Sequence, residues 1–374
     1  MKIRIGALLL LSQFCLGREI NVHQGQSIQV AVDQARSGDR VVVDPGTYHE
    51  VGRPCPSDPS AMCAVVISTD GISLVAKSSP HRPVILENAG GQDAGIEAAK
   101  AGQATCLTSA AAHIEEISIT GFTVNRFGGS GIRLVCADRW EVAFNSTNNN
   151  AEYGIFPVLS SKGRAHHNLA TGANDTGIYV GQSHDVRADH NLATNNVSGF
   201  EIENSTNVRM DHNEAFGNTG GMLVFILPGL AVLTGAQNTI DHNFVHDNNR
   251  ANTCLHPEED VCLVPPGSGI LAVAGAKNTI EHNLVLDNIS FGIAVSDFCT
   301  PFQVPTAQCF SLGFDPLPEN THVVFNVVEG NGTNSQFPGV PGADLFWTGA
   351  GTGNCWSHNK ADTEIPSPLP ACKQ

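Results

Sequence analysis

Residues 164–213 read RAHHNLATGANDTGIYVGQSHDVRADHNLATNNVSGFEIENSTNVRMDHN and contain the pattern that decides the fold. An asparagine closes each of three short segments, at Asn168, Asn191 and Asn213, so the pattern returns after 23 and then 22 residues. A step this regular is typical of a solenoid, in which each repeat forms one coil that stacks on its neighbour. The stretch therefore predicts a column of stacked coils.

The same landmarks extend the repeat in both directions along the chain. One asparagine column comprises Asn145, Asn168, Asn191, Asn213, Asn243, Asn283 and Asn326. A second column lies five residues later, is interrupted at Ala173, and comprises Asn150, Asn196, Asn218, Asn248, Asn288 and Asn331. Adjacent parallel strands lie about 4.8 Å apart, so like residues in successive coils can hydrogen-bond amide to amide. Because asparagine also tolerates the left-handed backbone of sharp turns, we expect both columns to form ladders at turns.

Between these landmarks the sequence indicates strands. Apolar and polar residues alternate in short runs such as 178–180, and helical periodicity is absent. An antiparallel sandwich would need hairpin turns and would not keep a fixed step. We therefore predict an all-β fold, a single-stranded right-handed parallel β-helix with 22–23 residues per coil and terminal caps. Extra residues fall at 228–235, 250–267 and 299–320, which we expect to be loops that leave the stacked core intact.

The chain divides into four segments by pattern. Residues 1–17 place two basic residues before a short apolar run, which is typical of a cleaved signal peptide. Residues 18–100 are expected to form the N-terminal cap and first coils, and residues 101–335 the β-helix repeats. Residues 336–374 depart from the repeat, and we expect them to cap the open end of the solenoid.

Cysteine content and charge indicate where the protein acts. Ten cysteines follow the signal peptide, and sequence neighbours suggest the pairs Cys55–Cys63, Cys106–Cys136, Cys254–Cys262, Cys299–Cys309 and Cys355–Cys372, although the sequence leaves the pairing open. Zinc ligation is the rival interpretation, but no Cys-x-x-Cys pair occurs. We therefore expect a secreted or periplasmic protein. A formal net charge of −16 argues against nucleic acid and anionic membrane surfaces as partners, and we expect no membrane insertion.

The N-terminal segment carries a family resemblance. Residues 26–50, QSIQVAVDQARSGDRVVVDPGTYHE, resemble the opening strand, cap helix and first coil of pectin-lyase-like β-helix proteins. Later segments resemble a bacterial group of parallel β-helix repeat proteins: YGIFPV (153–158), GIYVGQS (177–183), EIENS (201–205) and GGMLVFILPG (220–229). The resemblance implies the fold and a groove on one sheet that binds, cleaves or epimerises acidic polysaccharide. It does not establish an activity.

A cluster of polar residues is the candidate catalytic site. If the residues just after the repeated glycines point inward, those that follow them point outward. The cluster comprises Arg133, Tyr179, Glu201 and Glu203 on strands, with Tyr153 and Asp175 in adjoining turns. An arginine could bind a sugar carboxylate, while a tyrosine or carboxylate exchanges a proton.

Three alternatives to a lyase or epimerase site stay open. The carboxylates could hold Ca²⁺, or the cluster could be a solvated sheet face on which Arg and Glu pair. The motifs of polygalacturonases and of secreted alginate epimerases are absent, which places those two activities in doubt. Hydrolysis by Glu201 and Glu203 requires two residues of one strand to straddle the bond.

A column of histidines is the candidate metal site. His167, His190, His212, His242 and His282 precede the first asparagine column, and most follow an acidic residue. We assign the candidate ligands to His190, His212, His242, Asp189 and Asp211, which makes a copper-handling periplasmic role the alternative. A structural interpretation competes with it, since polar turn residues stack on their copies with the acids keeping the column neutral. A non-catalytic envelope scaffold is a further hypothesis. The sequence leaves the oligomeric state open and favours a monomer.

Overall fold

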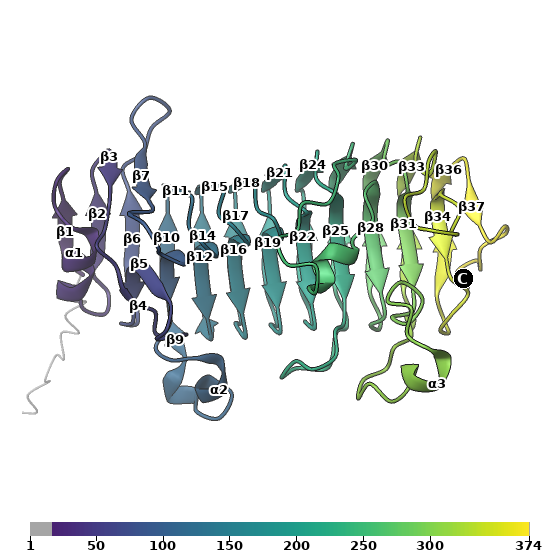
Figure 1. Ribbon diagram of the computed structural model, residues 1–374, viewed down its shortest axis with the longest axis horizontal. Helices are drawn as coiled ribbons and strands as arrows, with labels where there is room; N and C mark the ends of the chain where they lie inside the picture. The colour runs from purple at the N-terminus through teal and green to yellow at the C-terminus, as the bar shows by residue number, and fades with distance from the viewer. Residues whose placement is uncertain (1–16, 374) are drawn as a thin grey trace, which may run out of the picture.

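The computed structural model describes residues 17–373, so almost all of the predicted signal peptide at residues 1–17 lies outside the described residues. The chain winds into a long cylinder of stacked coils with the termini at opposite ends (Figure 1). Each coil contributes one short strand to each of three sheets, and successive coils pair in parallel. The predicted parallel β-helix is confirmed.

Two of the sheets consist of short strands. Sheet A contains, in order, β1 (Glu19–Val22), β2 (Arg40–Val43), β6 (Ser73–Ala76), β10 (Ser118–Thr120), β14 (Glu141–Ala143), β17 (Arg164–His166), β20 (Arg187–Asp189), β23 (Arg209–Asp211), β26 (Thr239–Asp241), β29 (Thr279–Glu281), β32 (His322–Val324) and β35 (Cys355–Ser357). Sheet B contains β3 (Gly46–Tyr48), β7 (Val84–Glu87), β11 (Phe122–Asn125), β15 (Ser146–Asn148), β18 (Leu169–Thr171), β21 (Leu192–Thr194), β24 (Glu214–Phe216), β27 (Phe244–His246), β30 (Leu284–Leu286), β33 (Val327–Glu329) and β36 (Lys360–Ala361).

Sheet C has the longer strands and carries the candidate site. It contains β4 (Arg53–Pro54), β5 (Met62–Ile67), β8 (Ala94–Ala98), β12 (Ser130–Val135), β16 (Tyr153–Val158), β19 (Thr176–Gly181), β22 (Ser198–Glu203), β25 (Gly220–Phe225), β28 (Ser268–Val273), β31 (Phe291–Ser296), β34 (Ala343–Trp347) and β37 (Glu364–Ile365). Only β4 pairs antiparallel within this sheet, with β5. A separate pair joins β9 (Ile114–Glu115) and β13 (Ala137–Asp138).

Inward-facing apolar residues fill the cylinder. Ile132, Ile155, Ile178 and Phe200 occupy equivalent positions of four successive coils, and each is fully buried. The residue after each of them therefore points outward from sheet C, as the alternation predicts.

Both asparagine columns form hydrogen-bonded ladders. The Asn168 Nδ2 donates to Asn191 Oδ1 at 3.0 Å, and the Asn191 Nδ2 donates to Asn213 Oδ1 at 3.0 Å. One part of the prediction was wrong, because the first-column asparagines are not the left-handed residues. The residue before each takes that conformation, for example His190 with φ of 55° and His212 with φ of 55°.

Helices are short and lie outside the coils. Helix α1 (Ile28–Gln34) covers the N-terminal end, and its N-cap Ser27 accepts a hydrogen bond from the Val30 N–H at 3.2 Å. The Glu50 carboxylate accepts from the Ile28 N–H at 2.6 Å, so a residue of the first coil fixes the start of the helix. The other helical turns, all in loops, are α2 (Gln103–Cys106), α3 (Thr306–Cys309), η1 (Ala110–Ala112) and η2 (Asp260–Leu263).

The C-terminal segment differs from the expectation. Residues 343–365 form a further coil, which adds β34 to β37 to the three sheets. Asn359 extends the first ladder by accepting from the Asn326 N–H at 3.0 Å, and Asp344 takes the asparagine position in the second by accepting from the Asn331 N–H at 2.9 Å. After residue 365 the chain returns to β35, where the Trp356 N–H donates to the Pro370 carbonyl at 2.8 Å.

The five disulfides pair the cysteines in the order that sequence neighbours suggested. Two of them, Cys254–Cys262 and Cys299–Cys309, close loops inserted at fixed points of the repeat. Within residues 17–373, no helix combines the length and apolar character that crossing a bilayer requires.

Candidate active site

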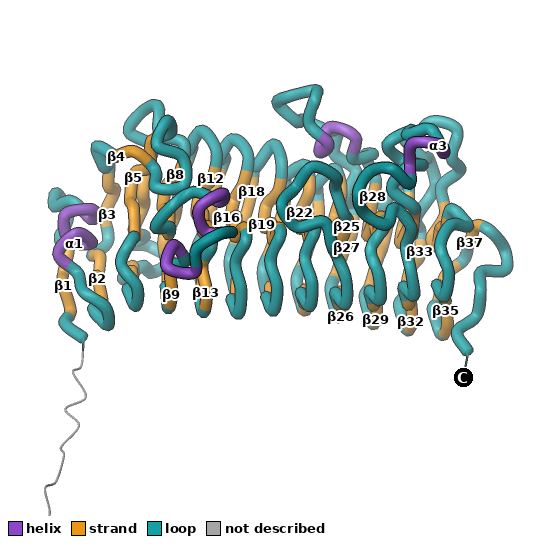
Figure 2. The backbone as a smooth tube through the Cα atoms, turned by 90° about the horizontal axis from the view of Figure 1, so that it is seen from below, coloured by secondary structure: helices purple, strands orange, loops and turns teal. Residues whose placement is uncertain are grey.

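A roofed groove runs along the outer face of sheet C. Its cavity measures about 510 Å³, within the range typical of small-molecule sites. Outward side chains of β16 to β34 form the floor. Loop residues from 227–230, 258–265, 300–302 and 337–340 form the roof. In Figure 1 the loop holding η2 lies in front of the strands near β25, and Figure 2 shows the same loop and the α3 loop projecting from the cylinder.

One half of the groove is acidic; we call it the acidic half. It comprises Tyr153, Asp175, Tyr179, Glu201 and Glu203 on the sheet side and Glu258, Glu259 and Asp260 on the roof. Glu201 and Glu203 point outward yet are 4% and 9% exposed, because the roof covers them. The Tyr179 hydroxyl donates to the Glu203 carboxylate, and the Thr176 hydroxyl donates to Asp175 at 2.8 Å.

Burial shifts the pKa values of these carboxyl groups upward. The pKa of Glu203 rises to about 7, mainly because burial penalises its charge, although the Tyr179 hydroxyl partly opposes the rise. The pKa of Asp175 rises to about 6 for the same first reason, with hydrogen bonds from Tyr153 and Thr176 opposing it. The pKa of Glu201 lies well above its usual range, because burial and the neighbouring Asp175 charge both favour the neutral acid. Three carboxyl groups of different acidity therefore share one site.

Aromatic rings separate the acidic half from the candidate arginine. The Phe156 ring stacks on Tyr179, with centroids 4.6 Å apart, and Tyr153 packs against Phe156 at 4.4 Å. Arg133 lies on the far side of Phe156, where its guanidinium binds Asp93 at 2.6 Å and Glu97 at 2.5 Å. The structure thus brings five of the six candidate catalytic residues together and places Arg133 outside the groove lining.

The other half of the groove is apolar; we call it the apolar half. Its floor comprises Leu223, Phe225, Leu271, Val273, Ala294 and Phe346, and its roof includes Leu227, Leu230, Val264, Phe302, Phe337 and Val340. The sequence analysis did not assign these residues to a site. Their signal was present as apolar residues at the outward positions of β25, β28, β31 and β34.

The chain resembles known proteins both in part of its sequence and in its whole fold. A family model described as a right-handed β-helix region matches residues 85–225. Similar solved structures include the mannuronan C-5 epimerase AlgE6 A-module of Azotobacter vinelandii, at 15% identity and a TM-score of 0.61, covering 90% of this chain and 86% of that one. The periplasmic alginate epimerase AlgG aligns at 14% identity and a TM-score of 0.58, covering 93% and 73%. Pectate lyase Pel9A aligns at 13% identity and a TM-score of 0.50, covering 95% and 81%.

The chain has the right-handed parallel β-helix, pectin-lyase-like fold. No curated protein matches it in sequence. At identities of 13–15% the likeness to solved structures concerns the fold alone.

The histidine column of the β-helix lies on another surface, at the turn between sheets A and B. The rings of His190 and His212 stack 5.1 Å apart at an angle of 5°, and the neighbouring histidines stack in the same way. Three of the rings bond the preceding aspartate through Nδ1: His190 with Asp189 at 2.8 Å, His212 with Asp211 at 2.9 Å and His242 with Asp241 at 2.9 Å. Two nitrogens that bind one zinc ion at about 2.1 Å each lie at most about 4.2 Å apart, so parallel rings at this spacing do not converge on a metal.

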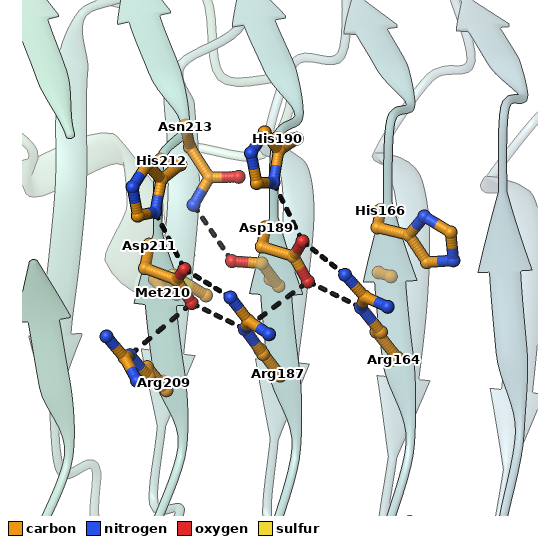
Figure 3. Close-up of polar contacts among 12 residues, drawn as sticks. Arg164, His166, Arg187, Asp189, His190, Arg209, Met210, Asp211, His212 and Asn213 are labelled. Atoms are coloured by element: carbon orange, nitrogen blue, oxygen red, sulfur yellow. Dashed lines mark hydrogen bonds and ion pairs between the residues drawn. The ribbon is translucent and has the colours of Figure 1, made fainter. Parts of the chain in front are cut away.

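Arginine side chains form ion pairs with the aspartates that precede these histidines (Figure 3). Arg164 binds Asp189 through two nitrogens at 2.7 and 2.6 Å, and Arg187 binds Asp211 at the same two distances. Because both carboxylates are buried and saturated with donors, the contacts favour the structural interpretation of the column. The metal role of these residues stays a prediction.

Other groups of potential ligands in the described chain involve cysteines. Three clusters of His, Cys, Asp or Glu have ligand atoms close together: Cys106–His113–Cys136, Cys55–Cys63–Glu97 and Asp297–Cys299–Cys309. Each contains a disulfide, whose sulfurs are not thiolates and do not serve as ordinary ligands. The acidic half is not among these clusters.

Proposed function

We propose that the β-helix acts on a glycan bound in the groove, by acid–base chemistry at the acidic half. The observation that carries the proposal is the set of roofed carboxyl groups whose pKa values are raised by different amounts. Environments that separate the pKa values of neighbouring carboxyl groups provide an acid and a base at the same pH. Such perturbed groups in a cleft are typical of catalytic sites.

The individual pKa values suggest roles. The raised pKa of Glu201 favours its protonated form and suits it to act as the general acid, whereas Asp175, whose pKa rises only to about 6, is largely ionised near neutral pH and is the general base. Glu201 gives its proton to the glycosidic oxygen as the bond from that oxygen to the anomeric carbon breaks. Asp175 takes a proton from the water whose oxygen forms the new bond. The cycle closes when the proton gained by Asp175 passes to Glu201, and Glu203, which Tyr179 holds by a hydrogen bond, can relay it.

The negative charge of the groove lining disfavours a negatively charged substrate. None of the described lining residues is Arg, Lys or His, while six are Asp or Glu. A uronate carboxylate would therefore meet negative charge without a protein cation to offset it. An uncharged glycan therefore fits the described lining better than a uronate polymer, and the lyase or epimerase chemistry expected from the sequence stays a second candidate.

Acidic polysaccharide is the second candidate substrate. The solved structures with a similar fold include alginate epimerases and a pectate lyase. Ca²⁺ bound by groove carboxylates would supply the missing positive charge, since it prefers oxygen ligands. On this candidate, activity on a uronate polymer would require added Ca²⁺ and would disappear with a chelator.

The test compares purified wild type with Glu201→Gln, Asp175→Asn and Glu203→Gln on panels of neutral and uronic oligosaccharides. We expect new reducing ends from a neutral glycan, a loss of rate of at least about 100-fold in Glu201→Gln, and unchanged folding by circular dichroism. Glu214→Gln is the matched control, because Glu214 lies on sheet B outside the groove. No turnover of any glycan with or without Ca²⁺ would contradict the proposal and favour the scaffold hypothesis.

We also propose an extracytoplasmic location, secreted or periplasmic. Five disulfides, including three that close loops of 8 to 10 residues, are typical of proteins from oxidising compartments. Fractionation of the native host, with free-thiol labelling of the mature protein, tests the location. A cytoplasmic protein with ten free thiols would contradict it.

A further inference from the structure

The apolar half is unusual for the outer face of a β-helix sheet. Outward positions of a solvated sheet carry polar residues, but here β25, β28, β31 and β34 carry Leu223, Leu271, Ala294 and Phe346. These four strands span three coil steps, which is about 14 Å. Part of this surface packs under the roof, since Leu223 and Leu271 contact Val264 or its neighbours. The remaining cavity is lined by apolar side chains above and below.

We infer that the apolar half binds the hydrocarbon chain of an amphiphilic, uncharged glycan whose sugar head lies in the acidic half. The inference deepens the proposed function by naming its substrate class. Phe225 and Val273 of the floor and Phe302 and Val340 of the roof all line the cavity, and all four keep part of their surface open. Burial of such surface against a hydrocarbon chain is favourable, at about 0.8 kcal/mol per methylene.

Charge complementarity selects the head group. Glu201 and Glu203 lie where the floor changes from carboxyl to apolar residues, and Glu258 and Glu259 lie above the acidic half. An anionic head, such as a free carboxylate or a phosphate, would be repelled, because the described lining contains no basic side chain. Sugar hydroxyls can donate to the carboxyl oxygens and accept from the protonated acids.

Disulfides and hydrogen bonds fix the conformation of the loops that form the roof. Cys254–Cys262 closes the loop that carries the roof residues 258–261, and Cys299–Cys309 closes the loop that carries Phe302. Asn252 Nδ2 donates to the Val261 and Val264 carbonyls at 2.9 and 3.1 Å, which fixes the first loop further. A preformed apolar channel binds a chain without the cost of ordering its own walls.

The experiment measures binding of methyl, butyl, hexyl and octyl β-glucosides by calorimetry, using the Glu201→Gln variant so that binding is separate from turnover. We expect affinity to rise about fourfold per methylene beyond the butyl glucoside, the equivalent of about 0.8 kcal/mol. Octanoate should bind far more weakly than octyl glucoside. Equal affinity across the glucoside series would overturn the inference, and octanoate binding as tightly as octyl glucoside would overturn the uncharged head.

Two groove variants and one control make the result specific. Ala294→Trp fills the apolar half and Leu271→Gln makes it polar, so each should abolish the gain with chain length while circular dichroism shows the β-helix intact. Leu284→Trp is the control, because Leu284 is an exposed apolar residue on sheet B, outside the groove. A loss in Leu284→Trp equal to that in Ala294→Trp would also overturn the inference. If octyl glucoside binds as expected but wild type turns over no glycan, the proposed chemistry fails while the binding site stands.

Discussion

At the residue scale, the histidine column shows how a turn selects its residue. His167, His190, His212, His242 and His282 have φ angles of 54–55°, a conformation that few residues other than glycine adopt readily. Histidine is among the residue types enriched there. Its ring then stacks on the next coil, and in His190, His212 and His242 the ring also bonds a buried aspartate, so backbone geometry and side-chain contacts favour the same residue. This accounts for a histidine repeat without a metal.

Asn191→Ala tests the ladders. Its Nδ2 donates to the Ala165 carbonyl at 2.9 Å and to Asn213 at 3.0 Å, and its Oδ1 accepts from the Asn168 N–H at 2.9 Å. The substitution leaves buried partners unsatisfied, so we expect the free energy of unfolding in urea to fall by about 2–4 kcal/mol. In the control Asn174→Ala, which loses one bond to the Ala151 carbonyl, a change of about 0.5 kcal/mol is expected.

Glu201→Gln should stabilise the protein at pH 8 while it removes activity. Wild type must keep a buried carboxyl group neutral at a pH where the unfolded chain ionises it. Removing that requirement should raise the free energy of unfolding at pH 8 and leave it unchanged at pH 4.

Glu97→Gln is the matched contrast for this prediction. Glu97 is fully buried like Glu201, but it pairs with Arg133 at 2.5 Å. Its substitution leaves Arg133 with fewer partners, so the free energy of unfolding should fall at pH 8. The same sign in both variants would contradict the assignment of Glu201 as a neutral acid.

At the scale of the element, the outer face of sheet C carries two kinds of surface, one acidic and one apolar. The coils of β16, β19 and β22 present tyrosines and carboxyl groups, and those of β25 to β34 present apolar residues. The strands themselves are nearly identical in length and register, so the difference lies in the outward positions and in the loops above them. The packing of the inward residues does not depend on which residues point outward. The same repeat can therefore carry an acidic surface on some coils and an apolar surface on others.

Loss of the Cys254–Cys262 disulfide should weaken groove binding more than it weakens the fold. In a Cys254→Ser/Cys262→Ser variant we expect the free energy of unfolding to fall by about 2–3 kcal/mol and octyl glucoside affinity to fall at least about tenfold. Cys55→Ser/Cys63→Ser is the control, since this bond has the same sequence separation of 8 and lies outside the groove. Equal loss of affinity in both variants would show that the roof is not specifically involved.

At the scale of the whole molecule, stability should depend on pH through the groove. The pKa values of Asp175 and Glu203 are raised to about 6 and about 7, so the folded protein binds more protons than the unfolded chain between about pH 4 and pH 7. The stabilisation that these groups give when protonated is complete below about pH 4 and is lost as the pH rises to about 7. Each group contributes on the order of 3 kcal/mol to that loss.

Urea unfolding at several pH values measures this dependence. We expect stability to decline from pH 4.5 to pH 7.5 in wild type and to decline less in Glu203→Gln. Below about pH 4 a separate loss is expected, because Arg164 and His190 hold the pKa of Asp189 down to about 2. A stability that rises between pH 4.5 and pH 7.5 would contradict the raised values in the groove.

By itself the sequence determined the solenoid. A step of 22–23 residues with asparagines at fixed places allows few other folds, because each coil meets only its neighbours and equal residues must then stack. The ladders and the inward row could be predicted for that reason, whereas the cap helix was expected from a family resemblance and the pairing of the cysteines was left open. The last coil was missed because Asp344 and Asn359 follow an interruption of the repeat.

Only the tertiary structure decided the site. Alternation indicates that Arg133 and Glu201 both point outward, but it does not indicate the direction in which a long side chain leans. Arg133 turns toward Asp93 and Glu97, whose charges it pairs with in a partly buried position. The roof depends on loops that come from distant coils and lie over the same strands. Burial by those loops raises the pKa values of the carboxyl groups, and burial is a property of the folded surface that no repeat encodes.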